Sequence, residues 1–272
     1  MELYYHHYLI ALAALFVVLE RLRPWRREQR VLRRGLANDL FYLAFNGHFL
    51  GLMLAQATAH TAAWFAEAAG WAGLQNMLYA GVASGWPIWV QVLVAFVGLD
   101  FVQWSVHNAL HRVPWLWEFH KIHHSIEELD WIGNFRFHWG EVIVYKAAQY
   151  VPLILLGFDG SVLLAFAVFG TVMGFFNHSN LDVDIGPLKY VFNNPRMHVW
   201  HHDRDEIPVP PGVNFAINFS VWDWMFGTAW LPDADRQPRR LGYEDMEALP
   251  RHLPGQLVHP LRVRKRAPAT AD

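Results

Sequence analysis

Histidine is the residue type whose number and spacing in this chain could do chemistry. The 272 residues include 16 His, and ten of these lie between His107 and His202. Most of the ten fall into groups with helical spacing: His107 and His111; His120, His123 and His124; His198, His201 and His202. Positions i, i+3 and i+4 share one face of a helix, so each group would present its imidazoles in one direction. Neutral imidazole binds Fe, Zn, Cu and Ni, so this spacing indicates a metal site.

The number of imidazoles indicates two ions rather than one. His178 stands alone at the end of an apolar run, in Asn177-His178-Ser179-Asn180. One ion cannot accept eight or nine imidazoles, whereas two ions with four or five nitrogen ligands each can. We therefore expect nine ligands: His107, His111, His120, His123, His124, His178, His198, His201 and His202. The remaining histidines without partner spacing are interpreted as interfacial, packing or surface residues: His6, His7, His48, His60, His252 and His259.

A supporting shell is expected around these ligands. Metal-bound His usually donates its other N–H to a carboxylate, which fixes the tautomer. Asp100, Glu141 and Asp223 are the candidate carboxylates. Asp100 interrupts an apolar run, where a charge is costly unless it faces the protein interior. Asp223 fits a helix cap or a turn equally well. His138 is placed in the same shell, with a role as a ligand left open.

The composition places these groups at a membrane. Hydrophobic residues make up 54% of the chain and charged residues 17%, and 14 Trp and 9 Tyr are present. A soluble domain is typically about 25% charged, and amphipathic rings favour the membrane–water boundary. The absence of Cys excludes thiolate ligands, iron–sulfur clusters and a Cys nucleophile within this chain. The net charge of −2 gives no reason to expect a nucleic-acid partner.

Several apolar runs must position the histidines. Leu3–Leu19, Leu40–Phe65 and Trp86–Trp104 are predicted to span the bilayer. Val142–Phe158 and Val162–Phe176 are predicted to form a helical hairpin that crosses or dips into it, with Asp159-Gly160 at the turn.

The orientation follows from the basic residues after the first run. Seven Arg lie between Arg21 and Arg34, against one acid, Glu28. The positive-inside rule makes that segment cytoplasmic. Counting spans then brings all the histidine groups to the same, cytoplasmic face, whether the hairpin crosses or dips. The membrane expected is the inner (plasma) membrane of the cell.

From Asp100 to Thr228 the chain resembles the fatty acid hydroxylase/sterol desaturase superfamily of membrane di-iron enzymes. The motifs that carry the resemblance are Asp100-x6-His107-x3-His111, Trp117-Glu118-Phe119-His120-x2-His123-His124, Arg136-Phe137-His138-x2-Glu141, Asn177-His178-Ser179-Asn180, His198-x2-His201-His202 and Trp222-Asp223-x2-Phe226-Gly227-Thr228. The chain departs from the family where Arg often follows the first box histidine, since Asn108 stands there. It departs again where Pro often follows the histidine matching His138, since Trp139 stands there.

The resemblance implies an all-α fold, in which a cytosolic, histidine-rich helical cap covers about four membrane helices. The organisation expected is membrane helices and a basic loop over residues 1–85, a catalytic domain over 86–230 and a C-terminal tail over 231–272. The resemblance also implies a di-iron centre, held by the box histidines, for O₂-dependent hydroxylation, desaturation or ether cleavage of a lipid.

The leading hypothesis is therefore an O₂- and reductant-dependent oxygenase with two Fe ions. Its substrate would be a lipid, a fatty-acyl compound or a sterol-like molecule in the bilayer. Electrons would come from a separate electron-transfer protein or reductase, because the chain has no G-x-G-x-x-G, Cys cluster or H-P-G-G motif.

Three other classes stay open at this point. A membrane zinc hydrolase needs about three protein ligands plus water, and neither H-E-x-x-H nor H-x-x-E-H is present. A haem carrier would pair axial His across membrane helices, and a metal transporter would line its spans with ligands. Here the His lie beyond the ends of the predicted helices instead.

Overall fold

A computed structural model describes residues 5–51, 53, 56, 60, 64, 67, 81–206, 212–232 and 236–262. The described part is helical and contains no β-strand, only isolated bridges between Pro24 and Leu181 and between Asp203 and Leu241. Its elements are α1 (Tyr5–Leu22), α2 (Leu36–Ala44), η1 (Phe45–Leu50), α5 (Ile88–Arg112), α6 (Pro114–His124), η2 (Trp131–Phe135), α7 (Trp139–Leu155), α8 (Gly160–His178), η3 (Gly186–Tyr190), α9 (Pro195–His201), α10 (Val221–Phe226), η4 (Met246–Ala248) and α11 (Leu253–Arg262). The predicted all-α membrane fold is confirmed.

Three of the described helices are long and apolar enough to cross a membrane: α1, α5 and α8. They match the predicted runs Leu3–Leu19, Trp86–Trp104 and Val162–Phe176. The predicted span Leu40–Phe65 begins within α2 and η1, and most of its second half lies outside the described residues.

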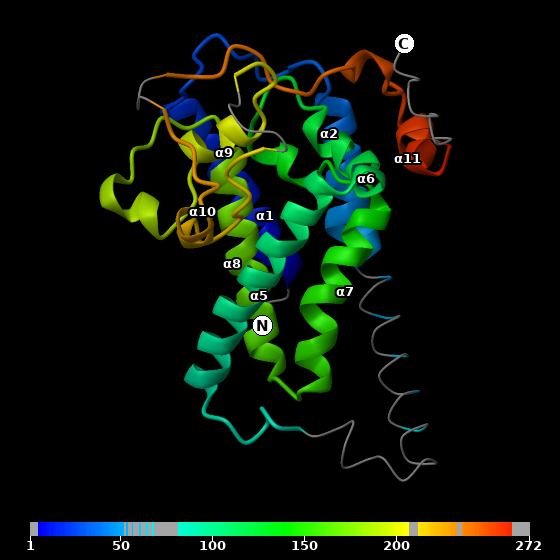
Figure 1. Ribbon diagram of the computed structural model, residues 1–272, viewed down its shortest axis with the longest axis vertical. Coiled ribbons are helices and arrows are strands. Elements are labelled where there is room, and N and C mark those ends of the chain that lie inside the picture. The colour runs from blue at the N-terminus through cyan, green and yellow to red at the C-terminus, as the bar shows by residue number, and fades with distance from the viewer. Residues whose placement is uncertain are drawn as a thin grey trace, which may run out of the picture.

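The hairpin of α7 and α8 extends as far as the beginning of α5. Asp159 caps α8 by accepting a hydrogen bond from the Ser161 amide (2.8 Å), and its own amide donates to Gln91 Oε1 in the first turn of α5 (2.8 Å). Apolar side chains of the three helices pack together above this turn, including Ala95, Leu153 and Phe166. The hairpin therefore reaches the same depth as α5, with its turn at the far end from the cap (Figure 1).

Helix α1 packs against α8 and carries the chain into the cap. The Tyr5 hydroxyl lies 2.7 Å from Thr171 Oγ1, and Phe16 meets Phe175 edge to face. At the end of α1, the buried Glu20 carboxylate accepts hydrogen bonds from the Trp131 and Asn180 amides (2.9 Å each). The basic segment that follows α1 thus lies at the same end of the molecule as the end of α8.

The cap gathers around the C-terminal ends of α5 and α8 (Figure 1). Helices α6, α9, α10 and α11 belong to it, and η2 packs closely on α8. This close approach needs a small residue at position 174, because a Cβ on Gly174 would collide with the whole side-chain amide of Asn134 in η2.

Gly174→Ala should therefore lower the free energy of unfolding by ~1–3 kcal/mol, the usual cost of overpacking. Gly170→Ala is the matched control, because no atom lies within 4 Å of a Cβ built one helical turn earlier at Gly170. The control should be neutral or slightly stabilising, since Ala is favoured over Gly inside a helix. Thermal unfolding in detergent measures both, and an equal loss in the two variants would contradict this packing.

Candidate metal centre

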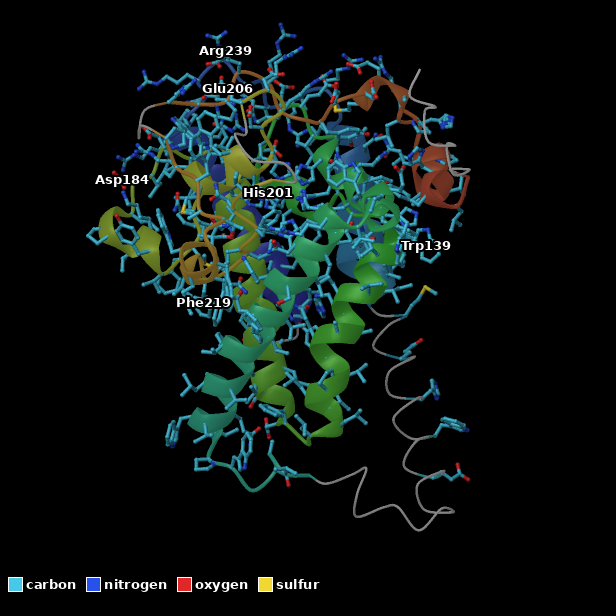
Figure 2. All side chains as sticks on the ribbon, in the orientation of Figure 1. Trp139, Asp184, His201, Glu206, Phe219 and Arg239 are labelled. Carbon is cyan, nitrogen blue, oxygen red and sulfur yellow. The ribbon has the colours of Figure 1, made fainter. Side chains whose placement is uncertain are left out.

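Four helix ends bring the predicted ligands together. His107 and His111 lie in the last turns of α5, and His178 is the last residue of α8. The two H-x-x-H-H groups end α6 and α9. Figure 2 places His201 inside the cap, near the upper end of α5.

The two box helices begin in the same way. Pro114 and Pro195 occupy their first turns, where the fixed φ of proline suits a helix and its missing N–H is no loss. Asn194 also caps α9 by accepting a hydrogen bond from the Met197 amide (3.1 Å). Each box therefore falls in the final turns of a short helix whose start the sequence fixes.

The nine imidazoles form two groups that fit two metal ions. Within each group, one nitrogen from every ring lies within 4.8 Å of the others: His107, His111, His120, His124 and His201 in the first group; His123, His178, His198 and His202 in the second. The groups abut, since the His124 and His202 rings stack with centroids 4.6 Å apart. Sequence reasoning predicted two ions with four or five nitrogens each, and the geometry supplies five and four.

Each H-x-x-H-H box contributes to both groups: the box in α6 gives two His to the first group and one to the second, and the box in α9 does the reverse. In α6 the i and i+4 residues, His120 and His124, join the first group, and His123 joins the second. In α9 the i and i+4 residues, His198 and His202, join the second group, and His201 joins the first. Both box helices therefore contribute ligands to both groups.

Hydrogen bonds fix the tautomers so that bare Nε2 atoms converge. Carbonyl oxygens accept from Nδ1 of His107 (Phe215, 2.6 Å), His201 (Val213, 2.7 Å), His178 (Gly174, 2.8 Å) and His123 (Arg136, 3.3 Å). A carbonyl can only accept, so Nδ1 carries the proton and Nε2 keeps its lone pair.

These lone pairs face one another at short distance. The Nε2 atoms of His123 and His178, both of which keep their lone pairs, are 3.2 Å apart. Two unprotonated nitrogens cannot hydrogen-bond to each other, so a cation between them is the arrangement that satisfies both. At metal–nitrogen distances of ~2.1 Å, neighbouring ligands of one ion lie roughly 3 Å apart. The residues present therefore fit a bound metal pair.

Burial keeps the imidazoles neutral. Eight of the nine are at most 2% exposed, and His111 is partly exposed. Burial lowers the pKa of His201 to about 4. Burial, and then the neighbouring imidazoles, hold the pKa values of His120, His123, His124, His198 and His202 well below the usual range. Because only a neutral imidazole can bind a metal, these shifts keep the candidate ligands competent at neutral pH.

The candidate carboxylates support the site at different distances. Glu141 Oε1 accepts directly from His120 Nδ1 (2.7 Å). Asp223 accepts from the Phe215 and Ala216 amides (3.0 and 2.9 Å), and so holds the loop whose carbonyls orient His107 and His201. Asp100 accepts from the Phe219 amide (3.1 Å) and Trp222 Nε1 (2.8 Å). Glu141 thus contacts a candidate ligand directly, whereas Asp223 and Asp100 fix the loop that precedes α10.

His138 lies outside both groups. Its Nδ1 accepts from the Gly140 amide (3.0 Å) at the start of α7, and its Nε2 lies 2.8 Å from the Leu257 carbonyl of α11. At Trp139, where the family often has Pro, the indole donates to the same Leu257 carbonyl (3.0 Å). At the other departure, Asn108 donates to the Trp104 carbonyl (3.2 Å) and accepts from Arg112 (3.3 Å).

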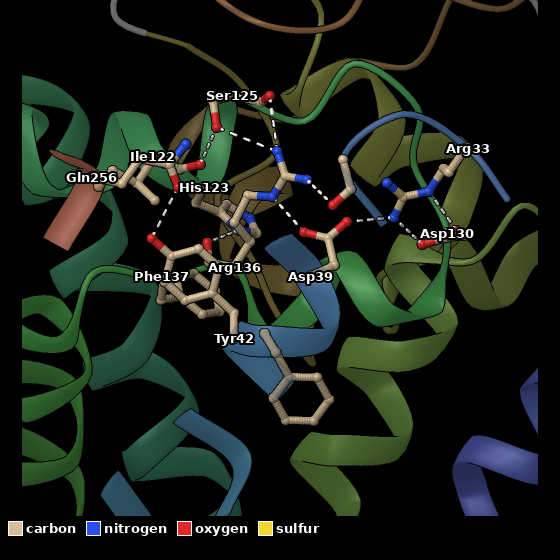
Figure 3. Close-up of polar contacts among 12 residues, drawn as sticks. Arg33, Asp39, Tyr42, Ile122, His123, Ser125, Asp130, Arg136, Phe137 and Gln256 are labelled. Atoms are coloured by element: carbon tan, nitrogen blue, oxygen red, sulfur yellow. Dashed lines mark hydrogen bonds and ion pairs between the residues drawn. The ribbon is translucent and has the colours of Figure 1, made fainter. Parts of the chain in front are cut away.

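A buried ion-pair network beside His123 was missed by sequence reasoning (Figure 3). Asp39 bridges two guanidinium groups, Arg33 (2.6 Å) and Arg136, and Arg33 also pairs with Asp130 (2.5 Å). The Arg136 carbonyl accepts from His123 Nδ1, and its guanidinium donates to the Ser125 carbonyl (3.1 Å). Arg33, in the basic segment after α1, is therefore connected to His123 through Asp39 and Arg136.

A family model for fatty acid hydroxylases matches residues 92–228, the part of the chain that supplies all nine imidazoles. The chain belongs to the fatty acid hydroxylase family. As a member of this family, it is similar to ornithine lipid hydroxylase OlsE of Rhizobium tropici, with 33% identity over 54% of this chain and 44% of that protein. It is also similar to alkylglycerol monooxygenase of Danio rerio, with 31% identity over 56% of this chain and 32% of that protein.

The likeness extends to a third relative at lower identity. A very-long-chain aldehyde decarbonylase of Oryza sativa subsp. indica is 22% identical over 78% of this chain and 34% of its own length. This fatty acid hydroxylase family member thus spans less than half the length of these three relatives. No solved structure matches the chain.

The partition into two groups predicts how metal content responds to mutation. His123→Ala removes one of four candidate ligands and should lower the metal content of purified protein from about two ions to about one. His124→Ala, its neighbour on α6, removes one of five and should cost less metal. Elemental analysis measures both.

His259→Ala is the control, because His259 Nε2 lies against Glu118 (3.2 Å) outside both groups. It should keep the full metal content. Loss of metal in this variant together with retention in His123→Ala would show that the centre lies elsewhere.

Proposed function

We propose that this chain is a membrane di-iron hydroxylase acting on a membrane lipid. The observation that carries the proposal is the pair of abutting, all-histidine groups where the cap meets helices long enough to span a bilayer. Iron is among the metals that imidazole nitrogens suit. The names of two relatives, a lipid hydroxylase and an alkylglycerol monooxygenase, favour hydroxylation over desaturation.

The residues divide the work as follows. The nine His would hold the two irons, which supply oxygen activation when bound. Glu141 keeps the proton of His120 on Nδ1, so that Nε2 stays available to a metal. Burial of eight imidazoles to 2% exposure or less excludes water from the reacting centre. Asp223 holds the amides of the loop whose carbonyls orient His107 and His201.

The reaction needs an electron donor outside this chain. Hydroxylation inserts one oxygen atom of O₂ into a C–H bond and reduces the other to water, which consumes two electrons and two protons. The chain has no Cys for an iron–sulfur cluster. A separate reductase or electron-transfer protein would supply the electrons, with O₂ as co-substrate. The zinc-hydrolase alternative is disfavoured, because groups of five and four His exceed the three protein ligands of catalytic zinc.

The cap would lie on the cytoplasmic face of the plasma membrane. Arg26 and Arg33, in the basic segment, contact the cap through Asn180 and Asp130. The positive-inside rule therefore orients the nine His directly, without a count of spans.

The reaction is tested by comparing the lipids of cells that express the wild-type chain or His198→Ala. One lipid class should gain the mass of one oxygen atom in wild-type cells alone, and the atom should be the heavy isotope when the cells respire heavy-isotope O₂. Wild-type cells whose lipids lose two hydrogens would indicate desaturation. An unchanged lipid profile despite a full metal content would contradict lipid hydroxylation.

Orientation is tested separately with single Cys residues in this Cys-free chain. Glu127→Cys lies on the exposed cap, whereas Gly85→Cys and Gly160→Cys lie at the far end, with no atom within 4 Å of the added Cβ. An impermeant thiol reagent should label positions 85 and 160 in intact cells, and position 127 only after permeabilisation. Labelling of position 127 alone in intact cells would invert the orientation.

A further inference from the structure

An exposed apolar surface lies on the cap, away from the histidine groups. It is formed by Leu188, Tyr190, Val191, Trp224, Met225 and Phe226, here called the η3–α10 patch. Its members are 37–66% exposed, and Met225, at 66%, is the most exposed of them. Contiguous exposed apolar side chains of this size mark an interaction surface.

The patch is a built surface rather than two loose segments. Trp224 Nε1 donates to the Lys189 carbonyl (3.0 Å), and the Ser220 hydroxyl donates to the same oxygen (2.7 Å). The Tyr190 and Trp224 rings meet with centroids 4.8 Å apart. Hydrogen bonds beneath the patch therefore fix η3 against α10, while the apolar parts of both point outward.

The patch continues without a break onto α5. Phe226 stacks on Trp104 of α5 (centroids 4.7 Å apart) and also meets Phe101 (6.1 Å). Phe101 is 39% exposed, and Val97 and Val94 continue the exposed apolar surface down the helix. Asp100 does not interrupt this surface, because it is 1% exposed and accepts hydrogen bonds from α10 and the preceding loop.

The position of this junction along α5 corresponds to a membrane boundary. Trp89, 68% exposed, lies near the beginning of α5. The distance from Trp89 to Trp104 along the axis is about 22 Å, from a rise of about 1.5 Å per residue. Because Trp and Tyr favour the membrane–water boundaries, the exposed Trp89 marks one of them. A hydrocarbon layer ~30 Å thick measured from Trp89 ends about 8 Å beyond Trp104, so Trp104 and the patch lie close to the opposite boundary. In Figure 1, α10 projects from the cap above the beginning of α5.

We propose that the η3–α10 patch inserts into the headgroup boundary of the same bilayer that holds α5, as a lateral anchor of the cap. Its continuity with the lipid-exposed face of α5 favours lipid over a protein partner, since such a partner would have to displace lipid from α5. The aromatic rings suit this depth, and the long Lys189 side chain could reach lipid phosphates. The anchor would fix the height of the histidine groups above the hydrocarbon. It concerns membrane attachment and does not depend on the proposed reaction.

The test places an environment-sensitive fluorophore on single Cys residues of the full chain, in phosphatidylcholine–phosphatidylglycerol vesicles. Met225→Cys and Leu188→Cys report on the patch through two independent elements. Val94→Cys is the control for the hydrocarbon. Glu247→Cys, whose side chain is 66% exposed on the cap, is the control for water. Three quenchers are compared. Two are attached to lipid chains, one at a shallow and one at a deep position, and the third is iodide dissolved on both sides of the vesicle membrane.

The patch labels should be quenched most by the shallow lipid quencher and several-fold less by iodide than the label at position 247. The label at position 94 should respond most to the deep quencher. Patch labels that respond to iodide like position 247 would overturn the proposal. Labels protected from both quenchers would overturn it too, because that result means a second copy or another protein covers the patch.

Discussion

The convergence of unprotonated imidazole nitrogens is the constraint on which the rest of the structure depends. Pairs such as His123 and His178 bring Nε2 lone pairs to 3.2 Å with both Nδ1 protons committed to carbonyls. A buried polar atom without a partner costs about 1–3 kcal/mol, and several such atoms meet here. A protein can hold this arrangement only if a cation satisfies the lone pairs or if the surrounding scaffold is rigid enough to oppose their repulsion.

The scaffold around the groups is correspondingly stiff. The carbonyls that receive the Nδ1 protons come from a helix (Gly174), from the segment before α7 (Arg136) and from the loop before α10 (Val213 and Phe215). Loop carbonyls hold a direction only when their chain is fixed. Asp223, buried at 0% exposure, fixes this loop by accepting the amides of Phe215 and Ala216. The helix ends supply the imidazoles, and the loops supply their orientation.

Local periodicity predicted much of this site and could not predict the rest. The i, i+3 and i+4 spacings identified the box helices, because neighbours on one helix face are set by local geometry. The partition of His123 from His124 could not be predicted from the sequence, since it depends on how the ends of α6 and α9 face each other. Asp223 was expected to accept from a metal-bound His, whereas it accepts from the Phe215 and Ala216 amides, because backbone donors leave no signature in side-chain types. The spans α1, α5 and α8 followed from length and hydropathy, which the bilayer thickness dictates.

The network of Arg33, Asp39, Arg136 and Asp130 could not be predicted from residue spacing. Asp39 pairs with Arg136, almost a hundred residues away, and no spacing rule connects them. Its signal was nevertheless present: Asp39 directly precedes an apolar run, and the reasoning that singled out Asp100 applies to it as well. Removing one partner of a buried ion pair typically costs ~3–5 kcal/mol, because the other charge stays buried. Asp39 holds two guanidinium groups, and Arg136 offers its carbonyl to His123. The segment whose charge would orient the chain in the membrane therefore also anchors the backbone that positions a candidate metal ligand. Membrane orientation and assembly of the candidate metal centre would then depend on the same arginine-rich stretch.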